Sequence, residues 1–130
     1  MQKFNKNFLG IPNCVFVPKG WGYEYWIWNN EDYCGKELFV KKGKRCSIHY
    51  HIKKDETFHI ISGQLSLEYS KEDFDNALKD SVKYTLLHAG DTFHIPANIR
   101  HRFMAWTDTK IIEFSTFHDE SDVVRLIVGD

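Results

Sequence analysis

Three histidines and one glutamate stand at spacings that could bind a single metal ion. His49 and His51 lie two residues apart in an apolar segment typical of a β-strand, so their side chains project from the same face. Glu56 follows a short polar turn, and an antiparallel hairpin would bring its carboxylate back toward the two imidazoles. His101 opens another apolar segment after a turn that contains Pro96, and a closed sheet would let it supply a third imidazole. Such a set suits Fe, Mn, Ni, Co or Zn and leaves coordination positions open.

The remaining histidines are interpreted from their places along the chain. His59 alternates with residues that we expect to face inward, so it is predicted to point away from the metal, toward an outer or intersubunit face. His94 either lines a cavity or lies outside it. His88 and His118 are predicted to be exposed.

The elements that must position these side chains are short β-strands. Segments rich in Val, Ile, Phe, Tyr and Trp alternate with glycines and charged pairs, which is typical of an all-β fold. Antiparallel strands of this number and length suit a jelly-roll barrel of two sheets. The polar segment 70–80 interrupts the rhythm and is either one helical turn or a solvated loop, of which we favour the second. The expected strands are 14–17, 23–28, 37–41, 45–51, 57–62, 64–69, 82–87, 92–95, 101–105, 110–117 and 123–128.

Composition and charge exclude several classes of protein. Hydrophobic residues make up 42% and charged residues 27% of the chain, which fits one domain over residues 1–130 and excludes a disordered or coiled-coil protein. Lys plus Arg is 17 and Asp plus Glu is 18, so this near-neutral chain is not expected to bind nucleic acid. No apolar run reaches the roughly 18 residues of a membrane span, and no signal-peptide pattern opens the chain. Three cysteines without metal-ligand or redox spacing are interpreted as reduced thiols of a cytoplasmic protein.

Two carboxylates and one guanidinium are candidate catalytic groups. Glu56 and Glu113 could each move a proton, although Glu56 is a poor base while it binds a metal and Glu113 is equally well explained as a polar rim residue. Arg102 directly follows His101, so on a regular strand it points to the opposite face, which favours a structural role unless a bulge intervenes. Four other basic residues could hold a phosphate or carboxylate, but a solvated charge is the simpler interpretation of each: Lys44, Arg45, Arg100 and Arg125.

Aromatic residues are crowded into the segment 21–28, which reads WGYEYWIW. Alternation places Tyr23 and Tyr25 on one face of a strand and Trp26 and Trp28 on the other. One face belongs to the core, and the other would leave a large aromatic patch exposed in a monomer, which is uncommon. We therefore expect a homodimer that buries this patch, with a sugar-stacking platform as the alternative.

The spacing of the candidate ligands resembles the motifs of the cupin superfamily. The first cupin motif, G-x5-H-x-H-x3or4-E-x6-G, is matched at every fixed place, by Gly43, His49, His51, Glu56 and Gly63. The resemblance implies a jelly-roll barrel with one divalent metal held by His49, His51, Glu56 and a histidine of the second motif.

The second cupin motif, G-x5-P-x-G-x2-H-x3-N, is matched in part. Gly90, Pro96 and His101 fill their places, and His101 is the fourth implied ligand. Asn98 replaces the motif's glycine, a tolerable change because Asn also adopts left-handed conformations. Ala105 replaces the final asparagine, so any polar contact from that asparagine is absent.

Further segments are similar to the cupin domain of type II mannose-6-phosphate isomerases. These are the Trp21-Gly22-Tyr23 opening, the Ile95-Pro96-Ala97 turn before His101-Arg102, Ile112-Glu113, and the closing segment 122–125. One departure is that Tyr50 stands between two histidines where that family often has three in a row, so the substrate could differ. The likeness keeps Arg102 as a candidate catalytic residue.

The resemblance implies a metal-dependent aldose–ketose isomerase that acts on a small sugar or sugar phosphate. The metal would bind the substrate's carbonyl and neighbouring hydroxyl, and Glu56 or Glu113 would move the proton between adjacent carbons. An iron-dependent dioxygenase and a non-catalytic sugar-binding barrel are the alternatives, because the same fold and motif serve all three. A metal-free sugar-nucleotide epimerase shares the fold, but the complete ligand set counts against it.

Overall fold

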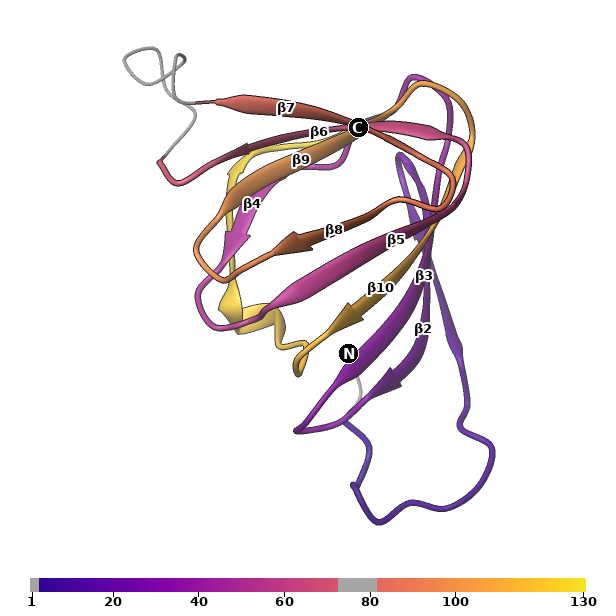
Figure 1. The fold of residues 1–130 in the computed structure, drawn as a ribbon. Helices are drawn as coiled ribbons and strands as arrows, with labels where there is room; N and C mark the ends of the chain where they lie inside the picture. The colour runs from indigo at the N-terminus through magenta and orange to yellow at the C-terminus, as the bar shows by residue number, and fades with distance from the viewer. Residues whose placement is uncertain (1–2, 73–81) are drawn as a thin grey trace.

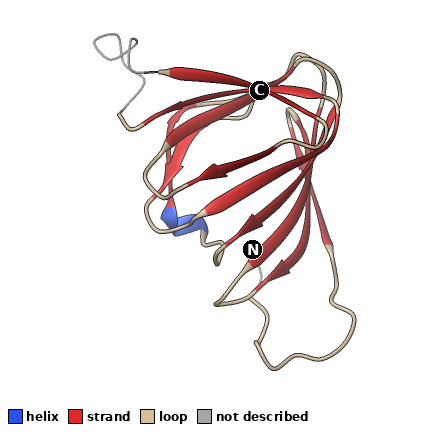
Figure 2. Cartoon of the chain, in the orientation of Figure 1, coloured by secondary structure: helices blue, strands red, loops and turns tan. Residues whose placement is uncertain are grey.

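The computed structural model describes residues 3–72 and 82–130, and in them the chain forms two antiparallel β-sheets that face each other (Figure 1). The strands follow the order β1-β2-β3-β10-β5-β8 in the six-stranded sheet and β11-β4-β9-β6-β7 in the five-stranded sheet. Figure 2 shows that strands dominate and that one short helical turn precedes the last strand. The predicted all-β jelly-roll barrel is therefore confirmed. The strands are β1 Val15–Lys19, β2 Gly22–Asn29, β3 Cys34–Val40, β4 Ile48–His51, β5 Glu56–Ser62, β6 Gln64–Ser70, β7 Lys83–His88, β8 Thr92–Ile95, β9 Arg100–Ala105, β10 Thr109–Ser115 and β11 Val123–Ile127.

The core forms where strands of the two sheets turn alternate apolar side chains toward each other. Strands β3, β5 and β10 alternate buried with half-buried or exposed residues along most of their length, as the period of two requires. Leu38, Ile60 and Ile111 of the six-stranded sheet pack with Leu65 and Leu67 of the five-stranded sheet. Each fully buried aliphatic side chain of this kind contributes roughly 1.5–3 kcal/mol.

The sequence-based boundaries differ from the structure by three residues at two strand starts and by at most two residues elsewhere. Strand β3 begins at Cys34, three residues before the expected start, and pairs with β2 through the Trp28–Gly35 and Asn29–Cys34 pairs. Strand β4 is shorter than expected, because Arg45 makes only an isolated bridge with Met104 before the ladder begins at Ile48. Most of the segment 70–80, for which we weighed a helical turn against a loop, lies outside the described residues.

One short element went unpredicted. The 3-10 turn η2, Glu120–Asp122, begins after Asp119, whose carboxylate accepts a hydrogen bond from the Ser121 backbone at 3.0 Å. This is a side-chain cap of the kind that Asp and Ser favour. Asp122 in turn accepts from the backbone of Lys53 and Lys54, which ties η2 to the turn between β4 and β5.

Asn98 has a φ of 69°, the left-handed conformation expected where it replaces a motif glycine. The backbone N–H of Asn98 donates to the His51 carbonyl at 2.7 Å, so this turn joins β4 to the segment that leads into β9. In the part of the chain described, no helix is long and apolar enough to cross a membrane. Cys14, Cys34 and Cys46 are free thiols, as predicted.

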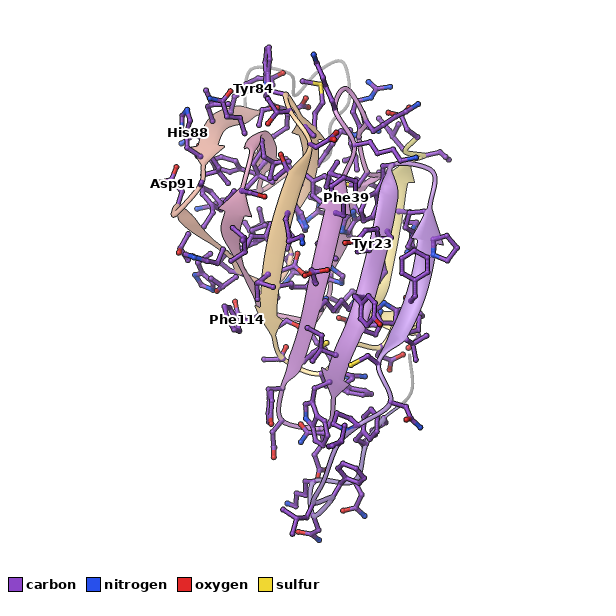
Figure 3. All side chains as sticks on the ribbon, turned by 90° about the vertical axis from the view of Figure 1, so that its right-hand side faces the viewer. Tyr23, Phe39, Tyr84, His88, Asp91 and Phe114 are labelled. Carbon is purple, nitrogen blue, oxygen red and sulfur yellow. The ribbon has the colours of Figure 1, made fainter. Side chains whose placement is uncertain are left out.

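The outer face of the six-stranded sheet carries an aromatic patch, made of Phe16, Tyr23, Tyr25 and Phe39 (Figure 3). Tyr23 and Tyr25 share this face as predicted, and Phe16 contacts both of them. On the opposite side of the strand, the Trp26 indole N–H donates to Glu24 at 2.9 Å. This part of the sheet's outer face therefore exposes several aromatic rings side by side, which is uncommon on the surface of a monomer.

Trp28 follows a register shift in β2 and packs against the N-terminal segment. Its ring stacks on Phe4 at 4.8 Å and lies near Phe8 and Tyr33, while its indole N–H is buried without a hydrogen-bond partner.

Gly63 makes the turn between β5 and β6, and we predict that substituting it destabilises the fold more than substituting another left-handed glycine. Its φ is 92°, and a Cβ there would lie 2.3 Å from the Asp108 carbonyl oxygen and 2.5 Å from Thr109 Oγ1. Gly43 has a φ of 81° but nothing within 4 Å of such a Cβ, so it is the matched control. We expect Gly43→Ala to cost about 1–2 kcal/mol and Gly63→Ala a further ~1–3 kcal/mol, measured by urea unfolding. Equal losses would show that the close approach at Gly63 is relaxed at no cost.

Candidate metal centre

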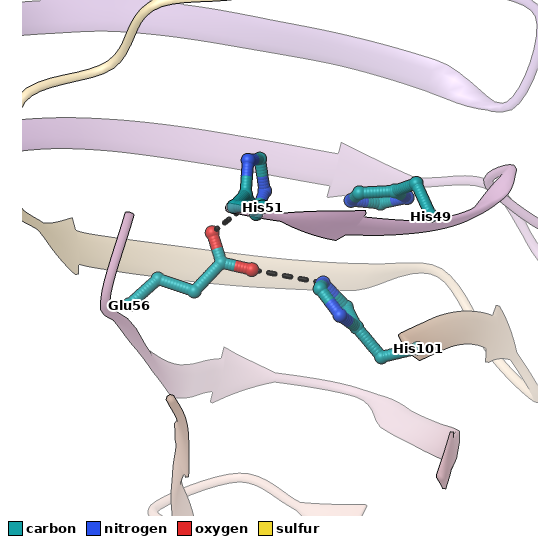
Figure 4. A group of neighbouring side chains, drawn as sticks. All are labelled: His49, His51, Glu56 and His101. Atoms are coloured by element: carbon teal, nitrogen blue, oxygen red, sulfur yellow. Dashed lines mark ion pairs between the residues drawn. The ribbon is translucent and has the colours of Figure 1, made fainter. Parts of the chain in front are cut away.

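The four predicted ligands converge from both sheets on one point (Figure 4). His49 and His51 project from β4, His101 comes from the neighbouring β9, and Glu56 reaches across from the start of β5 in the other sheet. One donor atom from each residue lies within 4.8 Å of the others. The side chains of His51, Glu56 and His101 are buried. The predicted convergence is therefore present, but the expected antiparallel hairpin is not: β4 and β5 belong to different sheets, so Glu56 meets the histidines from the opposite sheet.

Backbone carbonyl groups set the tautomers of two of the imidazoles. His49 Nδ1 lies 3.0 Å from the Ser47 carbonyl oxygen, and His101 Nδ1 lies 2.8 Å from the Ile99 carbonyl oxygen. A carbonyl oxygen only accepts, so each Nδ1 carries a proton and each Nε2 is the nitrogen left to bind a metal. Outer partners of this kind orient metal-binding histidines in proteins.

Three of the four clustered residues have a buried polar atom without a hydrogen-bond partner. They are His51 Nδ1, Glu56 Oε1 and His101 Nε2. His101 Nε2 and Glu56 Oε1 are 2.9 Å apart, an approach of two acceptors that requires a proton or a metal ion between them. Unsatisfied buried groups are costly, so these donor atoms fit a divalent cation.

The charge states of the cluster also fit a cation. Burial lowers the pKa of His49 well below its ordinary value, and burial lowers the pKa of His51 to about 4. Both imidazoles are therefore neutral, which is the form that binds metals. Burial alone would raise the pKa of Glu56, but the charge of Lys54 and the contact with His101 outweigh it and hold that pKa well below its ordinary value. The site thus offers three imidazoles and one carboxylate.

Lys54 is a site residue that the sequence analysis missed. We placed it in a polar turn, but its side chain is buried, with Nζ 3.2 Å from Glu56 Oε2 and 2.7 Å from Glu113 Oε2. Lys54 stands two residues before Glu56, so the strand period could have placed both side chains on one face. Lysines are usually exposed to solvent, but a lysine can be buried when it is paired, as Lys54 is here.

His118 is the second missed residue, and the prediction that it is exposed was wrong. It is only 5% exposed, and its Nδ1 lies 3.2 Å from both Lys36 Nζ and Lys54 Nζ. Ammonium groups only donate, so Nδ1 accepts and the Nε2–H donates to Glu120 Oε1 at 2.7 Å. Burial, together with the two lysines, lowers the pKa of His118. His118 lies in a loop, where no strand period indicates which side faces inward.

The other candidate residues are divided between the cavity and the surface. Glu113 lines the cavity beside the cluster. Arg102 is buried, but its Nε donates to the Cys46 carbonyl at 2.8 Å and its Nη2 to the Val128 carbonyl at 3.1 Å. These are bonds of a structural side chain, and the catalytic role of Arg102 stays a prediction.

The outer histidines point away from the cluster. His59 contacts Thr92 Oγ1 on β8, which fits the prediction that it faces outward. His94, for which two positions were open, is exposed and pairs with Asp55.

A cavity of about 260 Å³ opens beside the cluster. Its inner wall includes His49, His51 and Glu56, together with the aromatic rings of Phe58 and Phe103. Its charged wall includes Glu24, Lys36, Lys54, Glu113 and His118. The last three residues of the chain, 128–130, belong to its rim. Open space beside a candidate cation is what a catalytic centre needs and a closed structural site lacks.

We predict that His101→Ala and His51→Ala each abolish stoichiometric metal binding, because each removes a donor from the cluster. His59→Ala is the matched control, since it changes a histidine of β5 that faces away from the cluster. Elemental analysis of the purified variants, with thermal unfolding to check folding, gives the measurement. Stoichiometric metal in a folded His101→Ala variant would contradict the ligand assignment.

Comparisons with known proteins agree with this geometry. The family model described as "Cupin domain" matches residues 37–117, which include all four clustered residues. No curated protein sequence matches the chain significantly.

Solved structures share the fold at low identity. KdgF from Halomonas sp. is 17% identical with a TM-score of 0.62 over 76% of this chain and 81% of its own. The capsular polysaccharide assembling protein CapF from Staphylococcus aureus is 17% identical with a TM-score of 0.71, over 89% of this chain and 35% of its own. Oxalate decarboxylase from Bacillus subtilis is 16% identical with a TM-score of 0.74, over 91% of this chain and 31% of its own. The chain thus spans about a third of these two larger proteins. From the family match, which covers more than half of its residues, this chain belongs to the cupin domain family.

Proposed function

We propose that this protein is a metal-dependent aldose–ketose isomerase that acts on a small sugar or sugar derivative. The observation that carries the proposal is that a carboxylate outside the ligand cluster, Glu113, lines the same cavity as the candidate metal ligands. Isomerisation needs one polarised carbonyl and one base beside it. The likeness of the sequence to type II mannose-6-phosphate isomerases also supports this reaction class.

Glu113 is better placed than Glu56 to be the base. Glu56 is engaged at both oxygens, with His101 at Oε1 and with Lys54 and His51 at Oε2. The described contacts of Glu113 all use one oxygen, Oε2, which binds Lys54 Nζ at 2.7 Å and accepts from Ser115 Oγ at 3.1 Å. Glu113 Oε1 therefore has a lone pair available to take a proton from carbon and return it to the adjacent carbon.

The residues present would hold one divalent ion, Zn, Mn, Fe, Ni or Co, through His49, His51, Glu56 and His101. When bound, such an ion supplies Lewis-acid polarisation of the substrate's carbonyl. Lys54 orients Glu56 and Glu113 together, since its ammonium contacts both carboxylates. Phe58 and Phe103 give the cavity an apolar surface beside the cluster.

The test is turnover of a panel of aldoses, ketoses and their phosphates without oxygen, followed by hydrogen–deuterium exchange at the carbon beside the carbonyl. We expect activity that is lost on chelation and restored by a divalent metal. Glu113→Gln should lower kcat by roughly 10²–10⁴-fold, the usual effect of losing a general base, while metal content is retained. Glu37→Gln, on the outer face of the same sheet, is the control.

Two results would contradict the isomerase. Oxygen consumption with Fe(II) would assign the site to a dioxygenase, and sugar binding without turnover under any metal would assign it to a binding module. If the rate of hydrogen–deuterium exchange is unchanged in Glu113→Gln, another group must be the base.

We also propose that the protein is a homodimer through its aromatic patch. The patch lies beside the Glu37–Lys110 ion pair, so two copies related by a two-fold axis could exchange opposite charges while they bury the rings. Phe16, on the edge strand β1, is 56% exposed and is the natural anchor.

Light scattering during size-exclusion chromatography measures this association. We expect the unchanged protein to be a dimer and Phe16→Ser with Tyr25→Ser to shift it toward monomer. Tyr84→Ser, an exposed aromatic residue of the other sheet, is the control. If the unchanged protein is a monomer, the dimer proposal is wrong, and a sugar-stacking platform is the remaining interpretation of the patch.

A further inference from the structure

Lys36 is a buried ammonium with a hydrogen-bond donor to spare. It projects from β3, its side chain is 4% exposed, and it lines the cavity. Its Nζ has two polar partners among the described residues, Glu24 Oε1 at 3.3 Å and His118 Nδ1 at 3.2 Å. The Trp26 ring also lies 5.9 Å from this Nζ. An ammonium carries three N–H donors, so at least one of them has no polar acceptor among the described residues and is available to a molecule in the cavity. Lysines are almost never buried without full pairing, which marks this one as unusual.

Lys54 is more fully paired than Lys36. Its Nζ lies within 3.2 Å of two carboxylates, Glu56 and Glu113, and of His118 Nδ1. The two buried lysines therefore differ in their carboxylate partners: Lys54 has two and Lys36 has one, while both contact His118 Nδ1.

The buried charges around the cavity do not balance once the metal is bound. Lys36 is offset by Glu24, and Lys54 is offset by Glu113. Glu56 then leaves one negative charge, and imidazoles bind a metal in their neutral form, so a divalent ion in the cluster converts this to one net positive charge. An uncompensated charge in a buried site is costly, so a ligand that brings one negative charge completes the balance.

The cavity's rim does not change this balance. Its charged residues are two cations and two carboxylates: Lys19, Arg125, Glu120 and Asp130. All four are paired: Arg125 with Glu120 at 3.5 Å, Lys19 with Glu24 at 3.7 Å, and Asp130 with Arg45 at 3.5 Å. These side chains are exposed or partly exposed, so water and salt screen them more than the buried charges. A ligand with a doubly charged phosphate would therefore leave the buried site with one negative charge in excess, whereas a neutral sugar would leave the positive charge uncompensated.

We propose that the ligand of this cavity is a sugar acid, an aldose or ketose of about six carbons that carries one carboxylate, and that Lys36 Nζ donates to that carboxylate. The inference rests on the proposed isomerase function and narrows its substrate class. The volume of about 260 Å³ lies just below the roughly 300–1,000 Å³ typical of drug-sized ligands, which fits a small molecule of this kind. Lys36 is then the residue that selects the acid over the neutral sugar.

Equilibrium binding tests the inference without any need for turnover. Calorimetry on the zinc-loaded protein compares D-glucuronate, D-galacturonate and D-mannuronate with D-glucose, D-glucose 6-phosphate and inorganic phosphate. We expect at least one hexuronate to bind roughly tenfold or more tightly than glucose, as one charge-assisted hydrogen bond allows. Inorganic phosphate and the sugar phosphate should bind more weakly than that hexuronate.

Lys36→Met keeps the aliphatic stem and removes the donor, so it should lower hexuronate affinity by roughly tenfold and leave glucose affinity within about twofold. Lys110→Met, on the outer face of the same sheet, should change neither. Since Lys36→Met leaves Glu24 buried without its partner, the double variant Lys36→Met with Glu24→Gln removes both charges and serves if the single variant does not fold. Loss of hexuronate preference in the folded double variant supports the inference equally.

Three outcomes would overturn it: no hexuronate binds more tightly than glucose, a phosphate compound binds most tightly, or the folded Lys36 variants retain hexuronate preference. These outcomes are separate from those of the isomerase test. Hexuronate binding without isomerisation would reject the proposed reaction and keep this ligand class. Isomerisation of neutral sugars, with equal affinity for the sugar acid and the neutral sugar, would keep the proposed reaction and reject this ligand class.

Discussion

The structure of the site depends on one buried carboxylate, Glu56, that connects the two sheets. It belongs to the six-stranded sheet, but its oxygens contact His51 and His101 of the five-stranded sheet. A buried carboxylate is stable only when charges and donors compensate it, and here Lys54 supplies the fixed positive charge. Lys54 contacts Glu56 directly, and Glu113 and His118 both contact Lys54. These three residues thus form one network around the buried carboxylate.

The interior of this barrel is polar at one end and apolar at the other. Leu65, Leu67 and Ile111 fill the apolar part with aliphatic packing, as in any sandwich of two sheets. Around the cluster, inward positions on β3, β5 and β10 instead carry Lys36, Glu56 and Glu113. The strand period that places aliphatic side chains in the core thus also places charged ones at the site, and only pairing makes the second tolerable.

Sequence patterns with a fixed period were the ones that could be predicted. Alternation located the strands and placed His49 and His51 on one face, because strand geometry is local. The expected hairpin did not describe how Glu56 joins them, since its strand lies in the opposite sheet. His118 could not be found in this way, since it reaches the site from a loop and meets Lys36, 82 residues earlier, through packing alone. Lys54 was missed because most lysines are exposed. Its burial depends on pairing with Glu56 and with Glu113, and the second of these is far away in the sequence.

The end of the chain has a practical consequence for handling the protein. The Asp130 backbone N–H donates to the Arg45 carbonyl at 2.9 Å, and the Asp130 carboxylate accepts from the Arg45 N–H at 2.9 Å, so the terminus is held at the cavity's rim. Any residues that follow Asp130 must leave the fold beside the entrance. An affinity tag fused there, above all a polyhistidine one, would compete with the cluster for metal and crowd incoming ligands, whereas a tag on the other terminus would avoid attachment at this rim.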